Sequence, residues 1–211
     1  MTAGDEGTRE RLLDTAERLF AERGFDGASV REITAAAGCN VAAVNYHFGS
    51  KENLYREVFR RRLAALRDHR LARVRAVLGQ ADRPTVEAVL EAFTDAFLEP
   101  LVGEGPGRLL MELWAHEMFQ PRLPRELFQR EMLQPVQEAL AGALQAAEPG
   151  LGPEAARLAV FSVVAQLVHV VHRFRIAERS GGELPDLAGI ARHIVRFSAG
   201  GIRSLAPGAG A

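Results

Sequence analysis

One stretch decides the fold of this chain: GCNVAAVNYHFGSKENLY, which runs from Gly38 to Tyr55. Its apolar residues recur at intervals of three and four, which predicts a short helix over residues 40–48. Gly49 and Ser50 then interrupt the pattern, and a second, longer helix is expected to start after them. The stretch therefore reads as one short helix joined by a tight turn to a long one.

The residues just before this stretch predict a further helix. Ser29 and Glu32 have the spacing of a capping box, in which each side chain accepts a hydrogen bond from the backbone amide of the other residue. This helix is expected to end near Ala37, so that Gly38 supplies the turn. Two short helices separated by a glycine turn are typical of a helix-turn-helix. The same spacing also occurs in ordinary helical bundles, so it leaves both interpretations open.

The rest of the chain also reads as helix, because no stretch shows sustained alternation of apolar and polar residues. We therefore expect an all-α fold, with a bend or restart at Pro135, which cannot donate an intrahelical hydrogen bond. Glycine and proline bound the remaining segments. The other expected helices cover residues 8–23, 51–78, 85–101, 109–119, 125–147, 153–179 and 185–205.

Composition narrows the class of protein. The 211 residues are 47% hydrophobic and 25% charged, which excludes a disordered chain, and a single cysteine excludes an intramolecular disulfide. The N-terminus lacks the apolar run of a signal peptide, and the longest apolar run, residues 158–171, is shorter than a membrane span. We expect a cytoplasmic protein that binds no membrane. The net charge of −1 divides into +3 over residues 1–75 and −4 over the rest, so a nucleic acid would be bound by the positively charged residues 1–75. The alternative is that these basic residues only form a solvated face.

The stretch from Gly38 to Tyr55, with FDGASVREIT upstream of it, resembles the TetR family of bacterial transcriptional regulators. The resemblance covers about residues 8–60 and includes a complete Tyr-His-Phe-x-Ser-Lys-Glu pattern. Its Asn-Val-Ala-Ala variant is similar to the subgroup of cephalosporin- and chloramphenicol-related regulators. The resemblance implies a three-helix head on a helical-bundle body: residues 1–50 as the DNA-binding head, 51–80 as a connecting fourth helix and 81–211 as the effector-binding and dimerisation domain.

The resemblance and the residue chemistry together predict where DNA is bound. Ala42 and Ala43 allow a helix to approach the base edges closely, and Asn45 can both donate to and accept from one base. Lys51 can pair with a phosphate beside the exposed amides of a helix N-terminus. For His47 the alternative is a structural cap, and for Lys51 a solvated charge. The predicted DNA contacts are Ser29, Arg31, Val41, Ala42, Ala43, Asn45, Tyr46, His47 and Lys51.

A head of this size needs two copies one DNA turn apart, so we expect a homodimer. The resemblance places its interface on the last two helices, and the helix over residues 153–179 is apolar over most of its circumference. The alternative is that this helix is the centre of a monomeric core. The predicted interface residues are Phe161, Val164, Val168, Val171, Ile190, Ile194 and Phe197.

The resemblance further implies a small-molecule effector, unidentified, that releases a repressor from a palindromic, inverted-repeat operator. Large, adaptable side chains are the candidates to bind it, although such side chains at helical spacing are more often plain core. They are Phe93, Phe97, Met111, Trp114, Met118, Phe128 and Met132. The alternatives are a DNA-binding regulator without an effector and, third, an all-helical enzyme. No catalytic motif occurs, so no enzyme activity or cofactor is expected. A metal site is not expected, because neither His116 with Glu117 nor His169 with His172 has a third ligand at a defined spacing. Cys39 is expected to pack in the turn between the two short helices.

Overall fold

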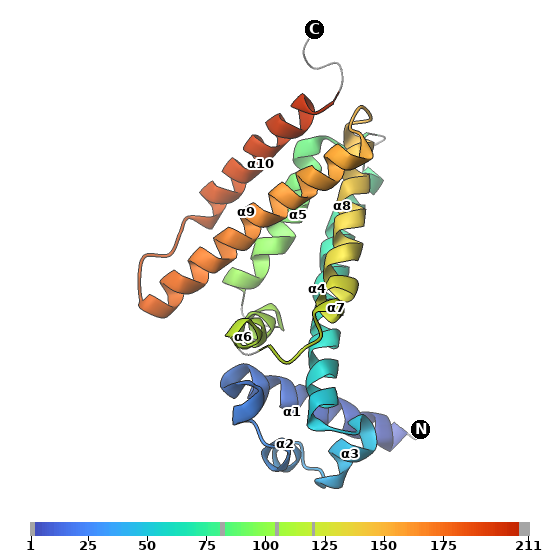
Figure 1. Cartoon of the computed structure of the whole chain (residues 1–211), viewed down its shortest axis with the longest axis vertical. Coiled ribbons are helices and arrows are strands. Elements are labelled where there is room, and N and C mark those ends of the chain that lie inside the picture. The colour runs from blue at the N-terminus through green and yellow to red at the C-terminus, as the bar shows by residue number, and fades with distance from the viewer. Residues whose placement is uncertain (1–2, 81–82, 104–105, 120, 207–211) are drawn as a thin grey trace. The chain divides into compact units, whose positions relative to one another are not determined.

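The computed structural model describes residues 3–80, 83–103, 106–119 and 121–206, and every regular element within these ranges is helical (Figure 1). This confirms the expected all-α class. The helices are α1 (Ala3–Gly27), α2 (Val30–Ala36), α3 (Ala42–Phe48), α4 (Lys51–Gln80), α5 (Val86–Val102), α6 (Pro106–Phe119), α7 (Arg125–Phe128), α8 (Gln134–Ala147), α9 (Pro153–Ser180) and α10 (Leu187–Ser204).

Local sequence signals explain several of the helix ends. In α1 the backbone leaves the helical region at Gly24, whose φ is 70°, and the Phe25 ring then stacks back on Phe20 with 6.1 Å between ring centres. Gly181 ends α9 in the left-handed conformation. Asp186 caps α10 by accepting a hydrogen bond of 3.0 Å from the amide of Gly189.

The predicted break near Pro135 takes the form of a π-helical turn. This turn, Gln129–Leu133, joins α7 to α8, and Pro135 lies in the first turn of α8. Proline has no N–H for the carbonyl four residues earlier, so the helix widens before it rather than running straight through.

The described residues pack as two units. The first contains residues from 1–65 and 104–131. Its core is aromatic: Tyr55 lies 4.9 Å from Phe20 and 5.0 Å from Phe59, measured between ring centres, in edge-to-face contacts. Helix α6 packs on α1 within this unit, where Nε2 of His116 lies 3.1 Å from the carbonyl oxygen of Ala21.

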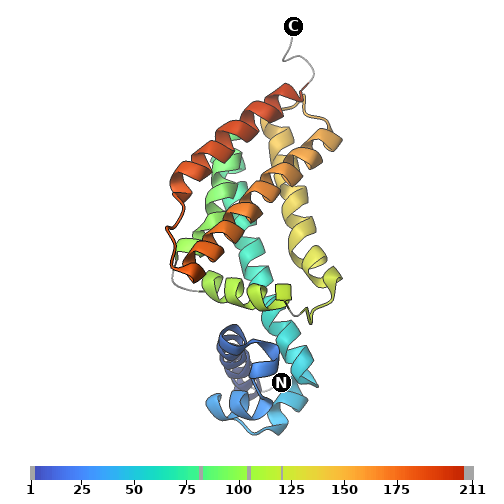
Figure 2. The same cartoon turned by 60° about the vertical axis from the view of Figure 1, so that its left-hand side comes forward.

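The second unit contains residues from 66–103 and 132–211, and α4 therefore contributes to both units. Helices α8 and α9 pack side by side, and α10 lies along α5 and α9 (Figure 1 and Figure 2). Phe93, Leu140 and Leu167 are fully buried in its core. An ion pair of 2.5 Å between Arg203 and Glu87 fastens α10 to α5.

Candidate nucleic-acid interface

The start of α2 is fixed by the predicted capping box. The Ser29 hydroxyl accepts from the Glu32 amide at 3.2 Å, and the Glu32 carboxylate accepts from the Ser29 amide at 2.9 Å. These hydrogen bonds from Ser29, with a smaller contribution from Arg23 at 3.0 Å, lower the pKa of Glu32. The Ser29 hydroxyl also donates to Glu32 at 2.6 Å, so both of its hydrogen-bonding roles are taken within the cap.

The turn between α2 and α3 is held by backbone hydrogen bonds. Gly38 has a φ of 64°, and the amide of Cys39 donates to the carbonyl of Thr34 at 2.8 Å. Asn40 then accepts from the Ala42 amide at 2.9 Å, which satisfies one of the free donors at the start of α3. Because a left-handed φ strains residues with a Cβ, glycine is the residue this turn requires.

Helix α3 has one buried and one exposed face. Val44 and Phe48 are buried, as predicted. Val41, Ala42, Asn45 and Tyr46 are exposed, and Tyr46 keeps 75% of its surface accessible. Ala43 is half-buried at the edge of this face, and Arg31 is exposed on α2. A short helix that shows small residues, an amide and a phenol on one face has the shape and chemistry to enter a major groove.

His47 lies differently from the exposed face. Only 9% of its side chain is exposed, and Nε2 lies 3.5 Å from the carboxylate of Asp5 on α1. Its ring also meets that of Tyr46 edge-to-face at 4.9 Å. His47 thus has a structural contact, with the carboxylate of Asp5 rather than as the cap given as the alternative, while its contact with DNA stays a prediction.

Lys51 is the first residue of α4. Its Nζ lies 4.2 Å from the centre of the Phe25 ring, a cation–π contact, and partial burial lowers the pKa of Lys51. The preceding Ser50 accepts from the Asn53 amide at 3.2 Å and caps the helix. The amine therefore lies beside the start of a helix, where the free amides and the helix dipole favour an anion such as a phosphate.

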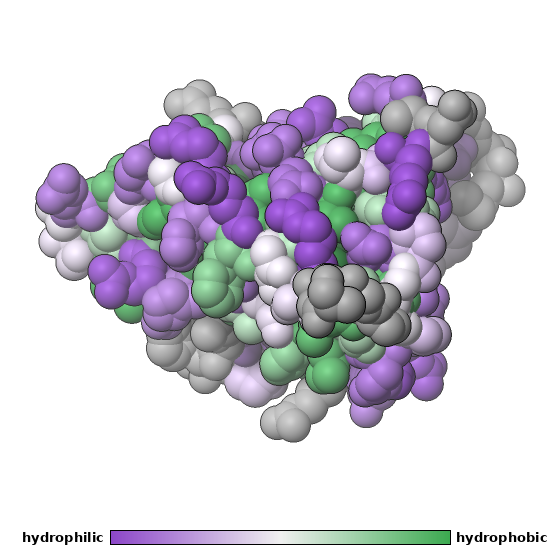
Figure 3. Space-filling view, turned by 90° about the horizontal axis from the view of Figure 1, so that it is seen from above, coloured by the Kyte–Doolittle hydropathy of each residue, from purple (hydrophilic) through white to green (hydrophobic). Residues whose placement is uncertain are grey.

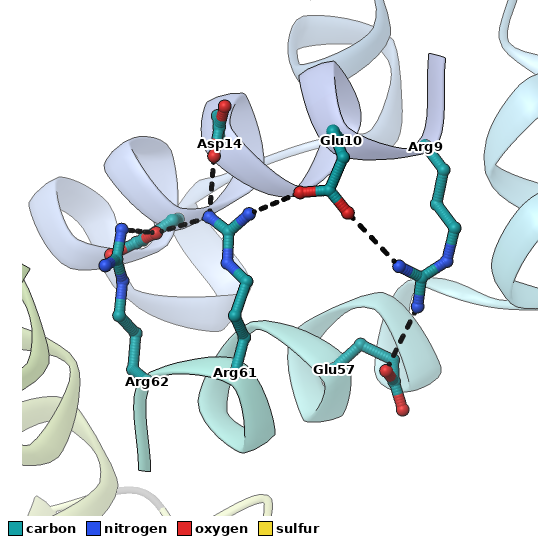
Figure 4. Close-up of polar contacts among 7 residues, drawn as sticks. Arg9, Glu10, Asp14, Glu57, Arg61 and Arg62 are labelled. Atoms are coloured by element: carbon teal, nitrogen blue, oxygen red, sulfur yellow. Dashed lines mark hydrogen bonds and ion pairs between the residues drawn. The ribbon is translucent and has the colours of Figure 1, made fainter. Parts of the chain in front are cut away.

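An ion-pair network joins α4, the helix that begins with Lys51, to α1 (Figure 4). Arg61 lies 3.0 Å from Glu10, 2.6 Å from Asp14 and 2.9 Å from Glu17, and Arg62 pairs with both oxygens of Glu17. Glu17 is only 1% exposed. These arginines are neutralised by α1, so the local positive charge is smaller than the sequence count indicates.

Sequence reasoning missed this network, although a signal for it exists. Glu10, Asp14 and Glu17 are spaced four and three residues apart, which places three carboxylates on one face of α1. A second missed contact is the end of α6, where the buried Glu117 carboxylate accepts from the amides of Arg122 and Leu123 at 3.0–3.1 Å. Burial raises the pKa of Tyr55. The negative charge of Glu117 and a hydrogen bond between Tyr55 and Glu117 raise this pKa further.

The predicted effector residues fall in both units. Phe93, Phe97 and Met132 are buried in the second unit, and Phe128 is half-buried in α7 of the first. The side chains of Met111, Trp114 and Met118 lie outside the described residues. His169 and His172 are exposed on α9, and no cluster of three or more potential metal ligands occurs among the described residues.

The predicted dimer residues divide into exposed and buried ones. Phe161 on α9 and Phe197 on α10 are 66% and 68% exposed, and Val168 is also exposed. Val164, Val171 and Ile190 are half-buried, whereas Ile194 is buried in the core of its own unit. The surface in the view of Figure 3 likewise has apolar patches between hydrophilic side chains. Ile194 therefore has little surface left to offer a partner.

Helix α9 is also the one described helix that is long and apolar enough to cross a membrane by length and composition, with a mean hydropathy of 1.5 in its most apolar window. The core helix of a soluble protein passes the same test. Its exposed face carries the polar or charged side chains of Ser162, His169 and Arg173 among the apolar residues.

A capped helix, a glycine turn and a short exposed helix together define a helix-turn-helix protein. Comparison with known proteins makes this specific. Residues 12–58 match the model of the bacterial regulatory proteins of the tetR family, and residues 91–201 match the tetracyclin repressor-like C-terminal domain. The chain belongs to the TetR family.

Individual relatives agree with this assignment. The chain is 46% identical over 57 residues to the transcriptional repressor AcnR of Corynebacterium glutamicum, covering 26% of this chain and 30% of AcnR. It is 37% identical over 97 residues to the repressor KstR2 of Rhodococcus jostii, covering 45% and 46% of the two chains. The chain thus spans less than half the length of these curated relatives. A TetR-family crystal structure from Mesorhizobium loti superimposes with a TM-score of 0.73, at 21% identity, over 97% of this chain and 98% of the other.

Proposed function

We propose that this chain is a homodimeric transcriptional repressor that binds an inverted-repeat operator in double-stranded DNA and is released by a small molecule. The observation that carries the proposal is the exposed face of α3, which shows Asn45 and Tyr46, together with the amine of Lys51 at the start of the following helix, α4. Family membership and the two repressors AcnR and KstR2 support it. In this proposal the head comprises residues 1–50, the connecting helix 51–80 and the body 81–211.

The proposed DNA-binding residues fall into those that contact bases and those that contact phosphates. Asn45, with Val41, Ala42, Ala43 and Tyr46, reads bases, because base edges carry the sequence information in the major groove. Ser29, Arg31, His47 and Lys51 position the head on phosphates, which carry none. Of these four, Ser29 and His47 already contact carboxylates within the chain, so Arg31 and Lys51, which form no ion pair among the described residues, are the stronger members.

The proposed dimer uses the exposed apolar residues of α9 and α10. Phe161, Val168 and Phe197, with half-buried Val164, Val171 and Ile190, form the contact, and a second copy removes them from water. Effector binding acts by favouring a state that does not fit the operator, since equal affinity for both states would shift nothing. A regulator without an effector is the alternative, and such a protein would release operator only by dilution or competition. The protein is proposed to work in the cytoplasm and to have no enzymatic activity or cofactor.

The test begins with selection of bound genomic fragments, which is expected to recover a short inverted repeat. Asn45→Ala is then expected to lose about 1–3 kcal/mol of preference for that operator over random DNA. Lys51→Ala is expected to weaken binding to all sequences alike and to reduce the salt dependence by about one phosphate contact. Arg179→Ala, which removes an exposed charge at the end of α9, is the control and should change neither quantity. Unchanged affinity and selectivity in both head variants would overturn the proposal.

A further inference from the structure

The second unit contains a buried arginine without a counter-charge. Arg70 of α4 is 7% exposed, and no carboxylate in the described part of the chain lies within ion-pair distance of it. Its Nε is buried without a hydrogen-bond partner, and its guanidinium lies 3.8 Å from the centre of the Phe97 ring. Arg61 and Arg62 in the first unit, by contrast, both pair with a buried carboxylate.

A second polar group nearby is also unsatisfied. Thr94 on α5 is fully buried, and its hydroxyl has no hydrogen-bond partner within the described residues. A threonine inside a helix usually donates to the carbonyl four residues earlier, and Thr94 does not. Thr94 and Phe97 are three residues apart and share a face of α5, so both unsatisfied groups belong to one neighbourhood, lined on the same helix by the buried ring of Phe93.

Arg70 keeps its charge at neutral pH. Burial lowers the pKa of Arg70 to about 9, which still leaves the guanidinium protonated in nearly all molecules at pH 7. A buried charge without a partner is costly, and proteins ordinarily pair it or replace it by an apolar residue. Two acidic residues that could fill this role are already engaged: Asp68, the nearest in sequence, lies 2.9 Å from Arg67, and Glu99 on the exposed side of α5 lies 2.7 Å from His69.

We propose that Arg70 and Thr94 form the anion-binding end of an effector site, and that the effector is an organic monocarboxylate whose apolar part lies against Phe93 and Phe97. This inference rests on the proposed function, because it names the class of molecule that releases the repressor. A planar guanidinium accepts the two carboxylate oxygens in parallel, and the Thr94 hydroxyl can donate a third hydrogen bond. A single charge is matched by one arginine, whereas a phosphate dianion would lack a second cation.

The experiment compares acids with neutral molecules of the same shape. Decanoate with decanamide, and 3-phenylpropionate with 3-phenylpropanamide, are titrated against the full chain while its melting temperature and its occupancy of operator DNA are followed. At least one acid is expected to act at a concentration about tenfold or more below that of its amide, because hydrogen bonds to a charged group are stronger than those between neutral groups. In Arg70→Met the acid is expected to lose this advantage, while operator binding without ligand is kept.

Two further variants keep the test decisive. Thr94→Val removes only the hydroxyl and is expected to weaken acid binding about three- to tenfold without lowering the melting temperature. Arg70→Lys, which keeps the charge but loses the planar pair of donors, is expected to bind acids with intermediate affinity. The proposal is overturned if no acid of the panel binds at millimolar concentration, if acid and amide bind equally, or if Arg70→Met retains the preference. Preference for acids in a protein that binds no DNA would instead keep the site and reject the proposed repressor.

Discussion

Removing the charge of Glu17 tests how the first unit is held together. Glu17→Gln keeps the shape of the side chain but leaves Arg61 and Arg62 without the carboxylate that both contact. Glu17 is almost fully buried, and breaking a buried ion pair by removing one partner costs about 3–5 kcal/mol. Arg61 keeps Glu10 and Asp14, so the expected loss lies at the lower end of this range, about 3 kcal/mol.

Urea denaturation gives the free energy of unfolding, and calorimetry gives the melting temperature. For a chain of this length, a loss of about 3 kcal/mol corresponds to a fall of roughly 6–12 °C. The matched control is Glu154→Gln, because Glu154 pairs with Arg157 on the exposed surface of α9 and its loss is expected to cost less than about 1 kcal/mol. The double variant Glu17→Gln with Arg62→Met is expected to recover part of the loss, because an apolar side chain replaces the arginine left unpaired.

A loss below about 1 kcal/mol for Glu17→Gln would refute this reasoning. It would mean that the two arginines reach water or other carboxylates without displacing α4 from α1. Operator binding adds a separate readout, since Lys51 begins the same helix that the network fixes on α1. A destabilised but folded variant is expected to bind operator more weakly.

Three further predictions concern a turn, a cap and the proposed dimer. Gly24→Ala is expected to lower the free energy of unfolding by about 1–3 kcal/mol in urea denaturation, because φ is +70° and the new Cβ would lie 3.1 Å from Nδ1 of His116. The control Gly142→Ala, in open space on α8, is expected to stabilise the chain. Equal effects of the two substitutions would contradict the strain argument. The hydrogen bonds with Ser29 lower the pKa of Glu32 from 4.5, so its carboxylate stabilises the fold above pH 4.5 and stabilises it less as the pH falls below that value. The difference in unfolding free energy between the parent and Glu32→Gln should therefore shrink on acidification. A constant difference would exclude the cap as its source. Phe161→Glu is expected to yield monomers in sedimentation experiments and to weaken operator binding, while the exposed control Glu183→Gln leaves both unchanged; a dimeric Phe161→Glu would place the interface elsewhere.

Short-range sequence signals predicted the local structure of this chain well. The Ser29–Glu32 capping box, the turn at Gly38 and the buried pair of Val44 and Phe48 all follow from spacings of a few residues, and the structure confirms each. The interruption near Pro135 was also predictable, because a missing N–H acts on the adjacent turn whatever the rest of the fold does.

The contacts that set the electrostatics of the candidate sites could not be predicted in the same way. The placement of α6 on α1 depends on His116 meeting Ala21, 95 residues away in the sequence. Counting charges along α4 gave no distinction between Arg61, which has three carboxylate partners, and Arg70, which has none in the described chain. That distinction arises only when helices pack, since it depends on which acidic side chains the neighbouring helix presents.

Lys51 is the only lysine among the 211 residues. An acylating reagent therefore meets a single side-chain amine in this protein, beside the α-amino group, and partial burial of Lys51 raises the fraction of its amine that is neutral and nucleophilic. Such a reagent would label Lys51 at the start of α4 and the α-amino group, and peptide mapping would follow the Lys51 product by itself. If Lys51 contacts phosphate, bound operator will slow that acylation, so the rate of labelling reports occupancy of the DNA site without any engineered residue.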